Sequence, residues 1–381
     1  MTCAYCRSAR AVNRDHVVPQ SYKKLGKEML KAVHDCASKG DFVLRNQLLE
    51  FERNLSKFVG TKYAAGTGSG TAALRLSYRV LGLKPGDEVI TVSHVFIAPI
   101  QEIVHLGAKP VLIDVKEDGL MDETLIEKAI TEKTVGIVPV HLSGKVCNMT
   151  EIMRIARKYK LWVVEDACQA LGATYKGKEA GAWGDIGCFS HIAPKTLGMW
   201  GDGGSIVTNN RKLYERFLLM RNHWNITQGV LHGHQPKAPK HMEWGENERL
   251  DNVHAAVLNV KIKHYPEMLR RRKQIGQMYN KGLKDLPIQL PIQQEGQIYQ
   301  EFIISIPDMK EFKKHMDSKG IELLIRDTTP NHVMYEWYFG KLSLPVTERH
   351  AISSVRLPTY PELTDKEVKE IIKAIQEYYA R

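Results

Sequence analysis

The sequence has no long apolar run and no recognisable export signal. Its 381 residues contain nothing close to the ~20 consecutive apolar residues that a helix needs to cross a bilayer. The opening stretch, MTCAYCRSARAVNRDH, lacks the apolar centre of a secretory signal. Cysteine is also scarce, and its six residues are scattered along the chain, which argues against a disulfide scaffold. We therefore expect a cytoplasmic protein with free thiols and no membrane partner.

The overall composition is that of an ordinary globular protein. Hydrophobic residues make up 43% of the chain and charged residues 25%, which argues against disordered and fibrous classes. The formal net charge of +11 attracts anions, either nucleic acid or phosphorylated small molecules. The basic residues are spread along the chain rather than gathered in one block, which disfavours nucleic acid. A small anionic molecule is the expected partner, and no nucleic acid is expected.

Short apolar segments alternate with helical patterns through the first two thirds of the chain. This alternation predicts an α/β fold, with a mostly parallel mixed sheet covered by helices. We expect a leader of unclear role at 1–22, a large domain at 23–262 that begins with a helical arm, and a small α+β domain at 263–381. The expected helices of the first part are 24–38, 44–59, 71–82 and 149–160, and the expected strands are 88–92, 109–115, 135–140, 161–166 and 187–190.

A glycine-rich segment, AAGTGSGTAAL at 64–74, places small residues where a loop enters a helix. Glycine permits close backbone approach, and the free N–H groups of a helix start attract phosphate. Ser69, Gly70, Thr71 and Ala72 are the candidate phosphate contacts. Taken alone, such a segment is more often a plain turn and helix N-cap.

An acidic pair ends the apolar strand in WVVEDACQALGA at 162–173. An aspartate in the position of Asp166 can keep the pyridine nitrogen of pyridoxal 5'-phosphate (PLP) protonated, which makes the ring a better electron sink. Gln169, one turn further on, can reach the phenolic oxygen of the same cofactor. A simple N-cap role for Asp166 is an equally common alternative.

The segment GDIGCFSHIAPKTLGMWGDGGSIVTNN at 184–210 carries Ser190 at a strand end and Lys195 five residues later, followed by a glycine-rich turn and a return strand. A lysine held in a buried irregular segment can be neutral enough to condense with an aldehyde. Ser190 would add a hydroxyl donor to the phosphate contacts. Phe96, just beyond another strand end, can stack on the pyridine ring, although most such aromatics are core residues and most lysines are exposed.

These motifs, in this order, resemble those of the DegT/DnrJ-type nucleotide-sugar aminotransferases, which are fold type I aminotransferases. The resemblance runs from about residue 25 to the C-terminus. It is carried by SGTAAL at 69–74, EDACQA at 165–170, CFS at 188–190 with Lys195 and GDGG behind it, VHLSGKVCNM at 140–149, RNHW at 221–224, GENERLDNVHAA at 245–256 and RLPTYPELT at 356–364.

The resemblance implies a role for each matching residue. Lys195 would form the Schiff base with PLP and act as the catalytic residue, and Asp166 would pair with the pyridinium nitrogen. Asn247 would reach the phosphate in the neighbouring subunit, which implies a homodimer with shared active sites. The other implied cofactor contacts are Gln169 at the phenolic oxygen, Phe96 on the ring, and Ser190, Gly70, Thr71 and Ala72 at the phosphate.

The resemblance also implies a reaction. An amino donor, L-glutamate in the family, would leave its amino group on the cofactor as pyridoxamine 5'-phosphate (PMP), and a keto sugar linked to a nucleotide would then receive it. Relatives that carry histidine in place of the lysine dehydrate sugars instead, so Lys195 favours amino transfer. Amino transfer to a cyclitol ketone and a PLP-binding regulator without turnover stay open as alternatives.

Two local sequences depart from the family pattern. Glu246 and Glu248 flank Asn247, where the family often has aromatic residues, and this puts the local cross-subunit contacts in doubt. His191 follows Ser190 directly, and we expect it to be a packed or hydrogen-bonded residue.

The first residues fall outside the resemblance. Cys3 and Cys6, followed by His16, resemble the opening half of a zinc module of the HNH nuclease type. A closed zinc site needs four ligands and no second pair lies nearby, so no metal is expected.

Overall fold

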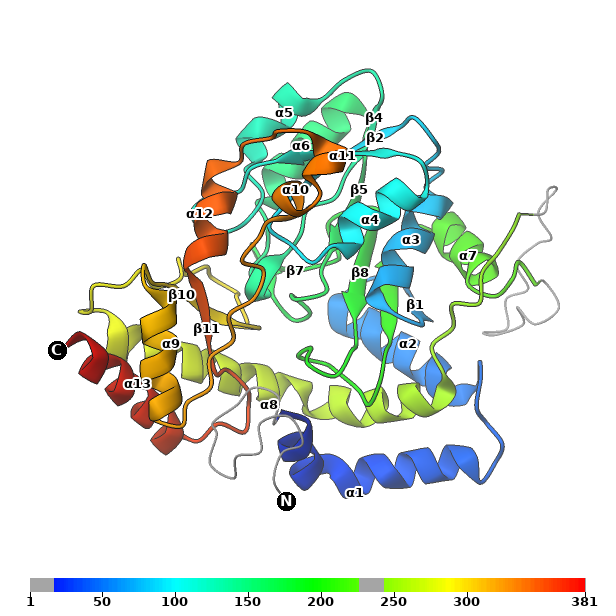
Figure 1. The fold of residues 1–381 in the computed structure, drawn as a ribbon. Coiled ribbons are helices and arrows are strands. Elements are labelled where there is room, and N and C mark those ends of the chain that lie inside the picture. The colour runs from blue at the N-terminus through cyan, green and yellow to red at the C-terminus, as the bar shows by residue number, and fades with distance from the viewer. Residues whose placement is uncertain (1–16, 226–242, 381) are drawn as a thin grey trace.

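The computed structural model describes residues 17–225 and 243–380, with side chains described from Leu25 onward. A seven-stranded sheet forms the centre of the larger part of the chain (Figure 1). Only β9 runs antiparallel to its neighbours, and every other pairing is parallel. In sheet order the strands are β1 (Tyr63–Thr67), β9 (Gly204–Thr208), β8 (Ile186–Ser190), β5 (Trp162–Asp166), β4 (Thr134–Ile137), β2 (Glu88–Val92) and β3 (Lys109–Ile113).

Helices cover both faces of this sheet, as the wholly apolar strands predict. Consecutive strand residues point to opposite faces, so Val163 and Val164 on β5 enter two separate apolar clusters. On one face lie α3 (Gly70–Val80), α4 (Ala98–His105) and α7 (Arg211–Met220). On the other lie α2 (Asn46–Val59), α5 (Ile126–Ala129), α6 (Met149–Tyr159) and the first half of α8 (Asn252–Leu283).

A smaller α+β part follows along the second half of α8. A third apolar cluster begins at Ile275 and contains only residues from there to Ile375. Helix α8 itself runs unbroken across residue 262, so the predicted domain boundary stays a prediction. The elements of this part are β10 (Phe302–Ser305), paired antiparallel with β11 (Ser354–Leu357), and α9 (Met309–Ser318), α10 (Asn331–Met334), α11 (Glu336–Phe339), α12 (Pro345–Ser353) and α13 (Asp365–Tyr379).

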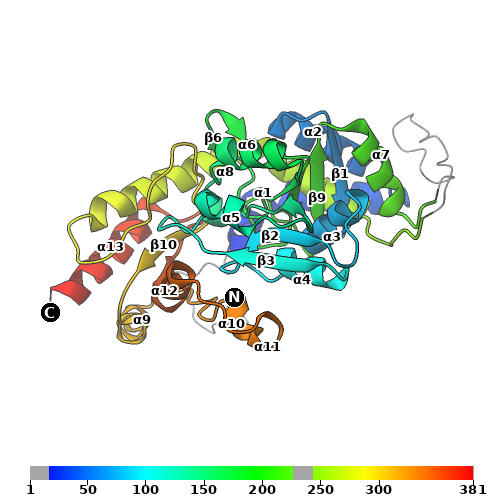
Figure 2. The ribbon, with the colours of Figure 1, turned by 90° about the horizontal axis from the view of Figure 1, so that it is seen from above.

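The N-terminal helix α1 (Val17–Ala37) lies along α8 at the edge of the larger part, as Figures 1 and 2 show from two sides. A two-stranded hairpin, β6 (Thr174–Tyr175) and β7 (Lys178–Glu179), and two short 3₁₀ turns, η2 (Glu123–Leu125) and η3 (Leu142–Gly144), complete the order. Cys3, Cys6 and His16, which resemble the opening half of a zinc module, lie outside the described residues. No helix within 17–225 and 243–380 is both long and apolar enough to cross a membrane.

The predicted α/β fold is confirmed, and one strand of the seven-stranded sheet was missed. β1 covers the beginning of the segment that we expected to be a loop, and it pairs antiparallel with the predicted return strand β9. Its sequence, YAAGT, has few of the β-branched and aromatic residues that mark strands, so the pairing with β9 decides its conformation.

Candidate active site

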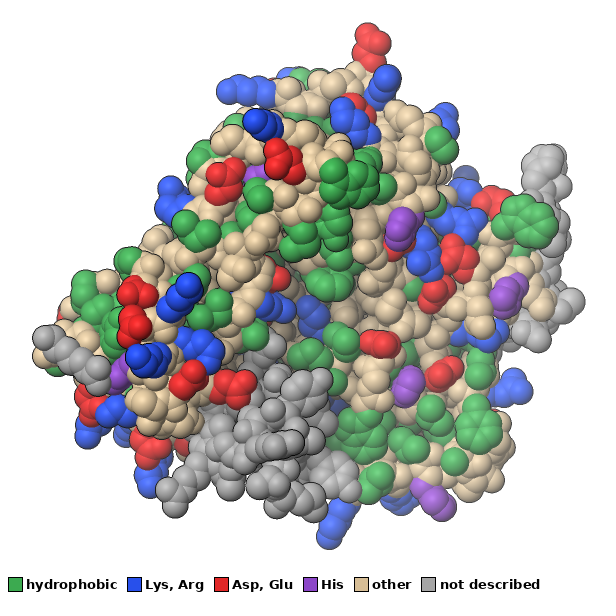
Figure 3. Space-filling view, in the orientation of Figure 1, with side chains coloured by type: hydrophobic (Ala, Val, Ile, Leu, Met, Phe, Trp, Pro, Cys, Tyr) green, Lys and Arg blue, Asp and Glu red, His purple; other side chains and the backbone are tan. Residues whose placement is uncertain are grey.

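A cavity of about 460 Å³ lies at the carboxyl ends of β5 and β8 and is closed on one side by the smaller part of the chain. Ligands of open α/β sheets bind at this edge. Figure 3 shows the face of Figure 1 hollowed near its centre, with Lys or Arg side chains at the hollow. Seven of the nine predicted cofactor contacts line the cavity: Gly70, Thr71, Phe96, Asp166, Gln169, Ser190 and Lys195.

The start of α3 forms one end of the cavity. Ser69 is the N-cap, and its hydroxyl accepts a hydrogen bond of 3.0 Å from the N–H of Ala72. A Cβ atom on Gly70 would lie 2.8 Å from the Cβ of Ser190, so only glycine allows these segments to meet. The first-turn N–H groups and the Ser190 hydroxyl therefore lie at one end of the cavity, which suits a phosphate group.

Asp166 and Glu165 are neighbours on β5 with opposite surroundings. Glu165 is fully buried away from the cavity and accepts hydrogen bonds from the N–H groups of Gly181, Trp183 and Gly184 at 2.8, 2.7 and 2.6 Å. Asp166 lines the cavity, and its Oδ1 accepts from the N–H of Cys168 at 3.1 Å. Strand alternation thus leaves Asp166 as the carboxylate that can meet a ring nitrogen.

Gln169 is held in one orientation by the chain beside it. Its Oε1 accepts a hydrogen bond of 2.9 Å from the N–H of Ser143. With the oxygen committed to Ser143, the amide nitrogen is left as a donor. A donor at this wall of the cavity fits the predicted contact with a phenolic oxygen.

Lys195 lies half-buried on the segment between β8 and β9, and helix α8 anchors that segment. The hydroxyl of Thr196 lies 2.6 Å from the hydroxyl of Tyr265, and the N–H of Thr196 donates to Oε1 of Gln300 at 3.2 Å. The Lys261 ammonium donates to the carbonyl of Gly198. These contacts fix the backbone on which Lys195 stands.

His191 is buried and hydrogen-bonded on both sides, as expected. Its Nδ1 lies 3.1 Å from the carbonyl of Leu197 and must donate, so its Nε2 accepts from the hydroxyl of Ser205 at 2.8 Å. Burial lowers the pKa of His191 to about 4, which keeps the ring neutral. The residue supports the segment that carries Lys195 and does not line the cavity.

Ala72 and Asn247 do not line this cavity. The Ala72 N–H is donated to Ser69, so its predicted phosphate contact stays a prediction. Asn247 is exposed on a segment bridged to Asn222. The two glutamates that flank it are bound by α3, because Arg75 contacts Glu248 at 2.6 Å and Glu246 at 2.7 Å. The ion pairs give this segment a fixed position without the aromatic residues that the family often has there.

The smaller part of the chain adds wall residues that the sequence reasoning missed. Gln300, Glu301 and Arg326 line the cavity. Both oxygens of Glu301 are paired, one with Arg326 and the other with Nε of Arg356 at 3.0 Å. These residues lie more than a hundred positions after Lys195 and carry no motif, so only the folded chain reveals them.

The cavity has the features that PLP requires. A phosphate would meet the start of α3 and Ser190, a ring nitrogen would meet Asp166, and an aldehyde would meet Lys195. Phe96 lines the same cavity with 66% of its surface exposed, which leaves an aromatic face for a planar ring. The residues present therefore fit the cofactor.

The comparisons with known proteins agree with this site. Residues 23–376 match the model of the DegT/DnrJ/EryC1/StrS aminotransferase family. The dTDP-3-amino-3,4,6-trideoxy-alpha-D-glucose transaminase of Streptomyces venezuelae is 34% identical, with 95% of this chain and 94% of that protein covered. The pleiotropic regulatory protein of Geobacillus stearothermophilus is 31% identical, with 94% of this chain and 96% of that protein covered.

A solved structure extends the likeness to the cofactor. NtdA from Bacillus subtilis, with bound cofactor PMP, superposes with a TM-score of 0.89 at 28% identity, covering 99% of this chain and 87% of that one. The family match spans nearly the whole described chain. NtdA, a structural neighbour of this chain, binds PMP, the aminated form of the cofactor that fits the cavity. The chain therefore belongs to the DegT/DnrJ/EryC1/StrS aminotransferase family and is a fold type I, PLP-dependent aminotransferase.

Proposed function

We propose that this protein transfers an amino group from L-glutamate to the keto group of a sugar linked to a nucleotide. The observation that carries the proposal is the meeting of Lys195, Asp166, Ser190 and the start of α3 in one cavity. The transaminase of Streptomyces venezuelae named above acts on a dTDP-linked sugar, which supports this acceptor class. The net charge of +11 favours the approach of an anionic diphosphate.

Each described residue has a separate task in this reaction. PLP supplies an electron sink and carries the amino group between the two substrates. The Lys195 amine anchors the cofactor and then moves a proton to and from the carbon that gains or loses nitrogen. Asp166 holds the positive charge on the ring nitrogen, Gln169 donates to the phenolic oxygen, and Phe96 covers the ring.

We further propose a homodimer in which Asn247 completes the active site of the neighbouring subunit. Asn247 is exposed and absent from the wall of its own cavity, while ion pairs from α3 hold its segment firmly. A fixed, outward-facing polar residue is suited to a contact in another subunit.

The test is a visible spectrum of the PLP-loaded protein before and after L-glutamate is added. We expect the band of the lysine-bound cofactor to convert to that of PMP, and Lys195→Ala to lack both the band and the conversion. Lys84→Ala, an exposed lysine far from the cavity, is the control and retains both. If the band of the lysine-bound cofactor does not form, both the assignment of Lys195 and the proposed reaction are wrong.

Two other functions are separated by the same preparation. One relative is named a pleiotropic regulatory protein, and for a regulator without turnover the band forms but no amino donor changes it. If the natural acceptor carries no nucleotide, as in a cyclitol ketone, ketones without a nucleotide convert the PMP form back to the PLP form as well as nucleotide-linked ketones do. The proposed function requires that a keto sugar without its nucleotide no longer converts the PMP form to the PLP form.

A further inference from the structure

The Phe96 turn, residues 93–96, follows β2 and brings Phe96 to the cofactor cavity. Its first three residues are buried, whereas the side chain of Phe96 is largely exposed at the cavity wall. Helix α4 begins at Ala98, only two residues later. The conformation of the Phe96 turn therefore decides where the aromatic ring lies relative to a cofactor.

Asn331, the first residue of α10 in the smaller part of the chain, binds the Phe96 turn through its side-chain amide. Its Nδ2 donates hydrogen bonds of 2.8 Å to the carbonyl oxygens of both Ser93 and Val95. The two protons of one amide nitrogen thus meet two carbonyls of the turn. Asn331 is buried, so these bonds are shielded from water. A carboxylate in this position would face two carbonyl oxygens without a proton to donate.

His332, the next residue on α10, holds the same turn through Ser93. Its main-chain N–H donates to the Ser93 hydroxyl oxygen at 3.0 Å, and its Nδ1 lies 2.8 Å from that oxygen. Its Nε2 lies 3.1 Å from the carboxylate of Glu348 on α12. An ionised carboxylate only accepts, so Nε2 donates, and in the neutral ring Nδ1 accepts from the Ser93 hydroxyl. These contacts form an unbroken chain from the Phe96 turn to α12.

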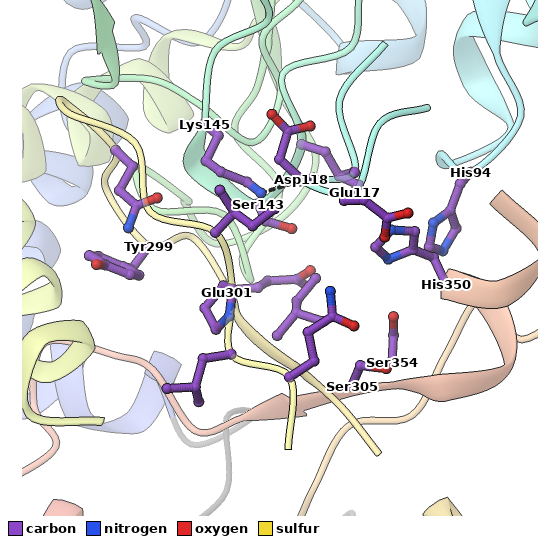
Figure 4. A pocket seen from close by; sticks show the side chains of 18 residues that line it. His94, Glu117, Asp118, Ser143, Lys145, Tyr299, Glu301, Ser305, His350 and Ser354 are labelled. Carbon is purple, nitrogen blue, oxygen red and sulfur yellow. Dashed lines mark hydrogen bonds between the residues drawn. The ribbon is translucent and has the colours of Figure 1, made fainter. Parts of the chain in front are cut away.

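Helix α12 is itself fixed on the larger part of the chain. The N–H groups of Val346 and Thr347, in its first turn, donate to the carboxylate of Asp114 at 3.0 and 2.9 Å, and Asp114 directly follows β3. Further along α12, His350 lies beside His94 of the Phe96 turn, with ring centres 6.1 Å apart (Figure 4). Helix α12 therefore gives the contacts between the smaller part and the Phe96 turn a fixed support.

We propose that Asn331 and His332 are positioning residues, which hold Phe96 in place over the cofactor ring. Neither of the two lines the cofactor cavity, so they act through the Phe96 turn. The inference rests on the proposed function, in which Phe96 covers the ring. Phe96 belongs to the larger part of the chain and its two supports belong to the smaller part. The ring is therefore covered correctly only when the two parts are packed together as in this structure.

The test variant is Asn331→Asp, which keeps the shape of the side chain and replaces the donating amide with a carboxylate. Ser93→Ala is a milder second variant that removes only the hydroxyl group bound by His332. Phe96→Leu is the reference for a ring without its aromatic cover. Asn259→Asp is the matched control, because Asn259 is a buried asparagine on α8 whose amide donates to a main-chain carbonyl at 2.8 Å and which does not line the cavity.

Two measurements on the PLP-loaded proteins report on the cofactor ring. The first is visible circular dichroism, which depends on how the protein surrounds the bound ring. The second is the rate at which L-glutamate converts the cofactor, followed by stopped-flow absorbance. We expect Asn331→Asp to lose visible dichroism as Phe96→Leu does and to react about tenfold more slowly than the wild type, with a smaller loss in Ser93→Ala. Asn259→Asp should lower the unfolding free energy in urea without changing either measurement.

A double-mutant cycle separates an effect through Phe96 from a general loss of structure. If Asn331 acts through Phe96, adding Asn331→Asp to Phe96→Leu slows the reaction no further. If the two losses multiply instead, the positioning role is wrong. It is also wrong if folded Asn331→Asp keeps the dichroism and rate of the wild type.

The remaining outcomes are also decisive. If Asn331→Asp does not fold, as shown by far-ultraviolet circular dichroism, the same cycle is made with Ser93→Ala. Wild-type behaviour of Ser93→Ala excludes His332 from the positioning role. If Phe96→Leu itself keeps both signals, Phe96 does not cover the ring and the inference falls with it. Failure of L-glutamate to convert the wild-type cofactor counts only against the proposed function, because the visible dichroism still tests the positioning.

Discussion

The hydroxyl groups of Thr196 and Tyr265 lie 2.6 Å apart and join the residue after Lys195 to helix α8. Tyr265 is fully buried, and its hydroxyl also donates to the carbonyl of Leu171 at 2.7 Å. Since Tyr265 uses its only proton on Leu171, Thr196 must be the donor to Tyr265. The long helix thus positions the lysine segment through a directional hydrogen bond.

Tyr265→Phe removes this connection and leaves the ring in place. We expect L-glutamate to convert the cofactor about tenfold more slowly, because the lysine amine is held less precisely. Stopped-flow absorbance of the PLP-loaded protein gives the rate. Tyr279→Phe is the matched control, since it loses a buried hydrogen bond of 2.8 Å to Pro358 far from Lys195. Equal rates in the two variants would show that the contact with Thr196 does not position Lys195.

Asp166→Asn and Glu165→Gln should fail in different ways. Asparagine can still accept from Cys168, so the first variant should fold and bind PLP while its conversion by L-glutamate falls roughly 100-fold. Glutamine at 165 breaks the buried ion pair between Glu165 and Nε2 of His141 at 2.8 Å and removes a charge that three N–H groups share, so the unfolding free energy should fall by about 3–5 kcal/mol. Urea unfolding and conversion rates distinguish the two effects. A stable but inactive Glu165→Gln protein would contradict this division of roles.

Asn247 and Lys195 can be tested for action across subunits by mixing inactive variants. If Asn247 serves the neighbouring subunit, a hybrid dimer of Lys195→Ala and Asn247→Ala chains contains one intact site. A statistical mixture of equal amounts should then regain about a quarter of wild-type activity after subunit exchange. If Asn247 serves its own subunit, no hybrid site is intact and the mixture stays as inactive as its parts.

Glu179 should make stability depend on pH. Burial raises the pKa of this carboxyl from 4.5 to about 7. The folded chain therefore holds a proton between these values that the unfolded chain has released, so unfolding free energy falls as pH rises from 4.5 through 7. Glutamine has the shape of a protonated glutamate and does not titrate. In Glu179→Gln, the change in unfolding free energy with pH should therefore be smaller by about 2 kcal/mol. Urea unfolding at pH 5 and pH 8 measures it, and a variant with the wild-type slope would refute the assignment.

The sequence by itself determined the sheet and the identity of the main site residues. Short apolar strands followed by helices can be covered only on both faces, so the α/β class follows from local pattern. Lys195, Asp166 and Ser190 stand at strand ends or just beyond them, and strands of one sheet bring such ends to a common edge. In the structure these three residues line one cavity, as expected.

Tertiary structure decided the features that depend on strand pairing and packing between segments far apart in the sequence. Strand β1 takes its conformation from β9, about 140 residues later, because hydrogen bonding to a partner outweighs its weak β-propensity. Glu165 and Asp166 look alike in sequence, and only the strand's orientation commits one to backbone N–H groups and the other to the cavity. Glu301 and Arg326 reach the cavity wall from segments more than a hundred residues after Lys195, so no local pattern predicts them.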